Sequence, residues 1–144
     1  MSTRVAYGIA GLLASVALAG CQATASAEGE LPEVATVEVP TEGGPGIVTL
    51  AAAAEERLGI ETTPVEDGPD GLVVPYAALV YATDGTSWVF VELDDATYQR
   101  AEVTVRSKHG EDLLLDSGPK AGTPVVTLGA AELVGVETGI DGEE

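Results

Sequence analysis

The fold of this chain is decided by the stretch Ser87-Trp-Val-Phe-Val-Glu-Leu93, which is followed across Asp94-Asp-Ala96 by Tyr98-Gln-Arg-Ala-Glu-Val-Thr-Val-Arg106. In the second segment apolar and polar residues alternate, which is typical of a β-strand with one buried face. In the first segment, Trp88-Val-Phe-Val91 is apolar on both faces and predicts burial on both sides. The turn formers between the segments predict that they are consecutive strands of one meander.

Shorter strand signals lie on both sides of this pair at regular spacing, separated by turn residues. Upstream, Ala77–Ala82 is joined to it through Asp84-Gly85, a strong β-hairpin signal. Downstream, Asp112–Asp116 and Pro124–Leu128 are predicted strands, and Ala130–Val134 is predicted to form one helical turn. The pattern as a whole predicts a β-meander.

The segment before the meander predicts two more strands and one helix. Ile47–Leu50 is a predicted strand, and Ala51–Leu58 is rich in helix-forming residues. Gly59 is placed to end this helix in a left-handed conformation. Ile60–Glu66 is the second predicted strand, and Asp67–Gly71 is a predicted loop of turn formers.

The N-terminus has the pattern of an export signal. An apolar run too short to span a bilayer comfortably ends at Leu18 and is followed by the small residues Ala19 and Gly20 and by Cys21, the single cysteine. Leu18-Ala-Gly-Cys21 resembles the lipobox of bacterial lipoproteins. The resemblance implies a signal peptide over residues 1–20, cleavage between Gly20 and Cys21, and lipid attached to Cys21. The alternatives are an ordinary signal peptide with a cysteine near its cleavage site, or a buried N-terminal helix.

Residues 21–46 are predicted to form a lipidated, flexible tether. Gln22–Pro40 is rich in Ala, Ser, Thr, Glu and Pro without a sustained period. Thr41–Gly46 is a run of turn formers that marks the expected domain boundary. One β domain is predicted over residues 47–137, and residues 138–144 are predicted to be a disordered tail.

The chain is strongly acidic, with 24 Asp and Glu residues against 6 Lys and Arg residues and a formal net charge of −18. Neutralising phosphates needs clustered cations, so this charge argues against nucleic acid as a partner and against direct adhesion to anionic lipid heads. The acidic residues are dispersed and lack the spacing of a calcium-binding loop. They are interpreted as a solvated surface, with a bound cation or cationic partner as the alternative, and no metal site is predicted.

Enzymatic catalysis is not expected from these residues. Cys21 is used by the predicted anchor, and His109, the single histidine, lies in a predicted turn with charged neighbours. No motif pairs a nucleophile with a base, and Gly118–Gly122 lacks the spacing of a phosphate-binding loop. The chain is therefore predicted to be non-catalytic and to use no cofactor.

Several motifs occur in one order along the chain. They are Leu58-Gly-Ile60 within Ile47–Glu66, Val74-Pro-Tyr-Ala-Ala-Leu-Val80, Trp88-Val-Phe-Val91, Arg100-Ala-Glu-Val-Thr-Val105, Ser117-Gly-Pro-Lys-Ala-Gly122 and Val125-Val-Thr-Leu-Gly-Ala130. Together they resemble the two halves of the membrane-proximal domain in periplasmic adaptor subunits, the membrane fusion proteins of efflux pumps. In that family a lipoyl-like domain, an α-helical hairpin and a β-barrel domain lie between the halves. Here Asp67–Gly71 alone joins them, so the resemblance implies a base without the parts that bridge two membranes.

The strand pattern and the resemblance predict a mostly β fold, a small β-roll or barrel of about six to eight short strands with one short helix. Most of the aromatic side chains are expected in its core. Tyr76 and Tyr98, each beside a proline or a turn, are the candidates for an exposed partner surface.

Two functions are compatible with these expectations. The first is a non-catalytic, membrane-anchored lipoprotein that serves as an adaptor-like accessory component of a transport system and contacts an inner-membrane transporter or another adaptor. The second is an acidic cell-envelope lipoprotein that binds a small cation or an envelope partner. In both, the lipid on Cys21 holds the exported chain at the extracytoplasmic face of a membrane. The resemblance supports the first function, and the acidity supports the second.

Overall fold

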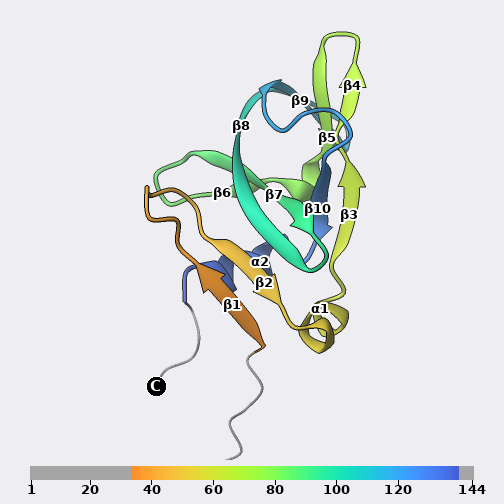
Figure 1. The fold of residues 1–144 in the computed structure, drawn as a ribbon. Coiled ribbons are helices and arrows are strands. Elements are labelled where there is room, and N and C mark those ends of the chain that lie inside the picture. Colours follow the sequence, from red (N-terminus) through yellow and green to blue (C-terminus); the bar gives the residue numbers. More distant parts are fainter. Residues whose placement is uncertain (1–33, 140–144) are drawn as a thin grey trace, which may run out of the picture. The chain divides into compact units, whose positions relative to one another are not determined.

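The structure of the chain is a computed structural model that describes residues 34–139 (Figure 1). The predicted signal peptide, its cleavage site at Gly20 and Cys21, the tether up to residue 33 and the tail from residue 140 lie outside the described residues. The described part is mostly β, with ten strands, two short α-helices and one short 3₁₀ helix. The predicted fold class, a small mostly β roll or barrel, is confirmed.

The elements follow one another along the chain as β1 (Ala35–Glu38), β2 (Ile47–Leu50), α1 (Ala52–Leu58), β3 (Glu61–Pro64), β4 (Glu66–Gly68), β5 (Gly71–Pro75), η1 (Tyr76–Ala78), β6 (Val80–Tyr81), β7 (Ser87–Asp94), β8 (Thr97–His109), β9 (Asp112–Ser117), β10 (Pro124–Leu128) and α2 (Ala130–Glu137).

The ten strands form one sheet that curls into a nearly closed barrel. Its main path runs β3–β10–β7–β8–β9–β5–β4, and each neighbouring pair is antiparallel. The two ends of this path, β3 and β4, are separated in the chain by Val65 alone. Val65 N–H donates to the carbonyl of Thr123 at 2.9 Å, and its own carbonyl accepts from Gly122 N–H at 2.8 Å. Since both ends of the path belong to one extended segment, the sheet closes on itself.

The long strand β8 runs through both the part of the sheet that contains β2 and β7 and the part that contains β9. Its first half pairs with β7 and β2, and its second half pairs with β9. The register shifts around Val105, and such irregularities bend a strand; Figure 1 shows the strong curvature of β8. The predicted alternation along this strand is confirmed, because Val103 is buried while Glu102 and Thr104 are exposed.

Two clusters of buried apolar side chains use alternating residues of the same strands. Val89 and Val91 of β7 belong to the first cluster, inside the curled sheet, and Phe90 belongs to the second. The second cluster is covered by β1, β2 and α2, which contributes the fully buried Leu133. Burial on both sides of Trp88–Val91 is therefore confirmed for its last three residues, and the cause is that β7 separates two cores.

The predicted boundary of the domain at Ile47 is wrong. β1, within the predicted tether, pairs antiparallel with β2 in the register Ala35↔Leu50 to Glu38↔Ile47. Ala35 and Val37 pack against the second cluster, while Thr36 and Glu38 are exposed. A short strand of alternating residues in an Ala- and Pro-rich segment gives a weak signal, and β2 supplies the partner that stabilises it.

Two local predictions within the domain are also wrong. Asp67–Gly71, predicted as a loop, is the end of the hairpin formed by β4 and β5, with Gly68 opposite Gly71. Ala77–Ala82, predicted as a strand, contains part of the 3₁₀ helix η1 and the two-residue strand β6. The strand count consequently exceeds the expected six to eight, because β1, β4 and β5 were not predicted as strands.

A glycine with positive φ lies at one end of each α-helix, after α1 and before α2. Gly59 follows α1 at φ 61° and its N–H bonds the carbonyl of Glu55 at 3.0 Å, which confirms the predicted left-handed helix end. Gly129 precedes α2 at φ 89°, and an added Cβ would lie 2.2 Å from Cδ1 of Ile60. This close approach explains why the chain turns at a glycine between β10 and α2. The predicted helical turn after Gly129 extends to the full helix α2.

An ion pair ties α2 to the sheet and to the segment before β2. Arg100 Nε on β8 lies 2.6 Å from Glu137 Oε2 at the end of α2, and the Glu137 side chain is 4% exposed. Glu137 Oε1 accepts the backbone N–H of Gly46 at 2.9 Å. The guanidinium carbon of Arg100 also lies 5.0 Å from the centroid of the Trp88 ring, in a cation–π contact. One carboxylate thus connects three segments that are distant in the sequence.

Candidate partner-binding surface

A groove with exposed apolar side chains lies between η1 and β6 on one side and β10 and α2 on the other. Its volume is about 540 Å³, and we call it the Tyr81 groove. The apolar side chains that line it are Ala77, Leu79, Val80, Tyr81, Leu128, Ala130, Ala131 and Val134. Several of these residues belong to the ends of short elements, which leaves their side chains only partly covered by neighbours.

Tyr81 and Leu128 are the largest exposed groups of the groove, at 63% and 51% of full exposure. Tyr81 pairs with Ser87 at the end of the short hairpin between β6 and β7, where few side chains reach it. Leu128 is the last residue of β10, directly before the turn at Gly129. Exposed apolar side chains that gather in one recess are typical of interaction sites, whereas single ones are common on any surface.

Tyr76 extends the same surface, which agrees with its predicted exposure. Its side chain is 42% exposed, and the ammonium of Lys108 lies 3.6 Å from the centroid of its ring. A second recess beside it is lined by Tyr76, Lys108 and Glu111, and Ala77 lines both this recess and the Tyr81 groove. Tyr76, the first residue of η1, and Tyr81 of β6 therefore line two recesses that share Ala77, and a role of Tyr76 in partner binding stays a prediction.

Tyr98 is not part of any exposed surface, so that prediction is wrong. Its side chain is 1% exposed and belongs to the second core cluster. The phenol hydroxyl donates a hydrogen bond of 2.7 Å to Glu55 Oε1 of α1. The turn beside Tyr98 suggested exposure, but the side chain lies on the face of β8 that packs into the second core cluster, and Glu55 of α1 bonds its hydroxyl.

The environment of Tyr98 raises its pKa above the ordinary value of 10.0. Burial is the main cause, because it disfavours the phenolate, and the hydrogen bond to Glu55 adds to it. The raised pKa means that the folded state keeps the proton after the unfolded state has lost it. The contribution of Tyr98 to stability is therefore complete below pH 10 and is lost as the pH rises above it.

The dependence of stability on pH in the alkaline range is expected to reveal the raised pKa of Tyr98. Between pH 10 and 11 the free energy of unfolding of the wild type should fall by up to about 1.4 kcal/mol from this one group. Tyr98→Phe should lower stability at pH 8 by about 1 kcal/mol through loss of the hydrogen bond, and should remove this part of the alkaline decline. Urea titrations followed by circular dichroism measure both effects. Tyr81→Phe, at an exposed site, is the matched control, and an unchanged alkaline decline in Tyr98→Phe would contradict the assignment.

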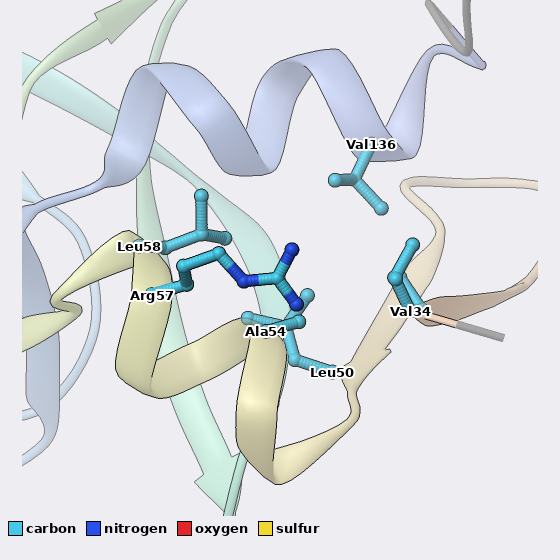
Figure 2. Close-up of a pocket in the computed structure, with 7 residues that line it drawn as sticks. Val34, Leu50, Ala54, Arg57, Leu58 and Val136 are labelled. Atoms are coloured by element: carbon cyan, nitrogen blue, oxygen red, sulfur yellow. The ribbon is translucent and has the colours of Figure 1, made fainter. Parts of the chain in front are cut away.

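A separate pocket lies between α1 and α2, and we call it the Arg57 pocket (Figure 2). It has a volume of about 240 Å³. Its lining consists of Val34, Ala35, Leu50, Ala54, Arg57, Leu58 and Val136, so that one cation accompanies six apolar residues. Neither the Tyr81 groove nor the Arg57 pocket was anticipated from the sequence, because each is formed by elements distant in the chain.

The described part of the chain has few other groups that could form a catalytic or metal site. His109 Nε2 lies 2.9 Å from Ser107 Oγ in an exposed position. Within residues 34–139, no group of three or more His, Cys, Asp or Glu side chains is arranged to hold a metal ion. Neither of the two α-helices between Val34 and Gly139 is long and apolar enough to cross a membrane.

Comparison of the chain with protein families, with curated proteins and with solved structures found no match. The resemblance to adaptor subunits therefore stays a prediction from the sequence motifs.

Proposed function

We propose that this chain is a non-catalytic, membrane-anchored lipoprotein whose β domain serves as an adaptor-like accessory component of a transport system. The observation that carries the proposal is the Tyr81 groove, together with the adjoining ring of Tyr76. A groove of this kind suits an apolar segment of a protein partner, because tyrosines at interfaces combine a large apolar ring with a polar hydroxyl.

The charge of the surface favours a partner with basic groups beside its apolar segment. Glu132 lines the Tyr81 groove, and Glu111 and Asp112 line the recess beside Tyr76. Lys108 is the cation that lines the recess beside Tyr76, and its ammonium already lies over the Tyr76 ring. Complementary charges across an interface increase association rates and exclude partners of the same charge.

The lipobox supports the same proposal from the sequence side. A lipid on Cys21 would hold the domain near a membrane, and the residues between Cys21 and Val34 would set its reach. Fully extended, these 12 residues, which make 13 Cα–Cα steps from Cys21 to Val34, would span at most about 45 Å. A membrane-embedded transporter is therefore the proposed partner, rather than a component across a second membrane.

Co-purification with a transporter tests this proposal. We expect a membrane transport protein to be recovered with the tagged full chain from detergent-solubilised membranes of the native host. In the double variant Tyr81→Ser/Leu128→Ser the recovered amount of the transport protein should fall at least about tenfold. Truncation of an interface anchor typically costs about 1–2 kcal/mol or more of binding free energy. Quantitative mass spectrometry of the eluates measures the ratio.

Leu93→Ser is the matched control, because Leu93 is 52% exposed but does not line the groove. Recovery that falls equally in this control would point to general loss of surface apolar area instead of a specific site. Isolation of the wild type as a lone monomer, with stability that depends on added cations, would favour the alternative of a cation-binding envelope lipoprotein.

A further inference from the structure

The walls of the Arg57 pocket are formed by segments that the fold brings together from three regions of the chain. Ala54, Arg57 and Leu58 occupy one face of α1, at the spacing that places helical residues side by side. Val34 precedes β1 on the opposite side, and Val136 comes from the last turn of α2. Figure 2 shows the guanidinium of Arg57 between the two helices, with Leu58 on one side and Val34 and Val136 on the other.

Of the five cations of the described range, three contact an acidic or aromatic side chain, whereas Arg57 and the exposed Lys120 do not, and Arg57 lines a pocket. Arg100 and Arg106 are paired with Glu137 and Asp116, and Lys108 lies over the ring of Tyr76. Arg57 forms no ion pair with any residue from Val34 to Gly139, although the chain is strongly acidic. An unpaired guanidinium beside an apolar recess offers a ligand both a cationic contact and a place to bury an apolar chain.

We propose that the Arg57 pocket binds a single-chain anionic amphiphile, an aliphatic chain that ends in a carboxylate. The chain would lie against Leu50, Ala54, Leu58 and Val136, and the carboxylate would bond the guanidinium, whose planar fork matches its geometry. A neutral or cationic amphiphile would gain the apolar contact without the charge contact. The charge of Arg57 therefore determines the class of ligand, and the apolar walls determine its shape.

The size of the pocket limits the ligand further. A volume of 240 Å³ corresponds to about eight water molecules at roughly 30 Å³ each. The pocket therefore holds a medium-length chain segment and not a whole two-chain lipid. Because the site lies apart from the Tyr81 groove, this inference and the proposed docking of a transporter can fail independently.

Photolabelling of the full chain in lipid nanodiscs tests the proposal. Two probes carry the same medium-length chain and a mid-chain diazirine, and they end in a carboxylate or in a neutral amide. We expect the carboxylate probe to label peptides that contain Leu58 or Val136 at least about threefold more than the amide probe, a ratio suited to an exposed cation. Proteolysis and mass spectrometry measure the labelling at each peptide.

Two substitutions separate the charge from the cavity. Arg57→Gln should bring the two probes to equal labelling, whereas Lys120→Gln, which removes the same charge at an exposed site outside the pocket, should leave the ratio unchanged. Ala54→Leu should fill the recess and reduce labelling by both probes, with circular dichroism as the check that the domain stays folded. If it unfolds, the Arg57→Gln comparison decides, since Arg57 is exposed. Equal labelling by both probes in the wild type, or labelling that avoids the pocket, would overturn the proposal.

Discussion

Arg100→Met is expected to lower the free energy of unfolding of the domain by about 3–5 kcal/mol, because it removes one partner of a buried ion pair. Glu137 would remain with a 4% exposed side chain and without its cation. The position of Glu137 at the C-terminal end of α2 adds to the destabilisation, because the carbonyl end of a helix disfavours negative charge. Methionine keeps an apolar stem beside Trp88, so that the loss of charge dominates the effect.

Urea denaturation at neutral pH measures the change, and a surface pair provides the control. Arg106→Met breaks the pair with Asp116, whose side chains are both about half exposed, and should cost less than about 1 kcal/mol. The double variant Arg100→Met/Glu137→Leu removes both charges and should recover part of the lost stability, although it does not restore the hydrogen bond from Gly46 N–H to Glu137. Equal effects of Arg100→Met and Arg106→Met would show that the Glu137 carboxylate reaches water in the folded state.

Cys21→Ala is expected to move the protein from the membrane fraction to the soluble fraction. A single acyl chain binds membranes weakly, but two or three chains on one residue anchor a protein stably. Cys21→Ala would remove the proposed site of lipid attachment, and the strongly acidic chain itself has little attraction for anionic lipid heads.

Fractionation and intact-mass measurement test the anchor together. The wild type should have the mass of a chain that begins at Cys21 plus acyl groups, and Ser26→Ala in the same segment should leave both mass increment and localisation unchanged. An unmodified Cys21 in the wild type, or membrane association that persists in Cys21→Ala, would contradict the lipobox interpretation.

The strands with the strongest local patterns were predictable from the sequence. β7 and β8 alternate or are apolar on both faces, and the turn formers between them set their antiparallel pairing. β2, β10 and the end of α1 at Gly59 were recognisable for the same reason, because side-chain periodicity and glycine conformation act within a few residues.

Weakly patterned segments were not predictable, and their structure depends on neighbours. β1 is a four-residue strand that exists beside β2, and β4 is a three-residue strand that exists beside β5. Short strands gain little from their own residues, so a distant partner decides whether they form. The same holds for Ala77–Ala82, which is split between η1 and β6.

Composition, alternation and turn chemistry are local properties, so the mostly β domain and the predicted export signal could be read from the residues. Which side chains are buried and which are exposed depends on the packing of distant elements. That packing buried Tyr98 against Glu55, left Tyr81 and Leu128 exposed, and placed Arg57 beside an apolar recess. The physical reason is that the burial of a side chain depends on which strands and helices cover it, and that pairing joins residues up to 91 positions apart, as between Gly46 and Glu137.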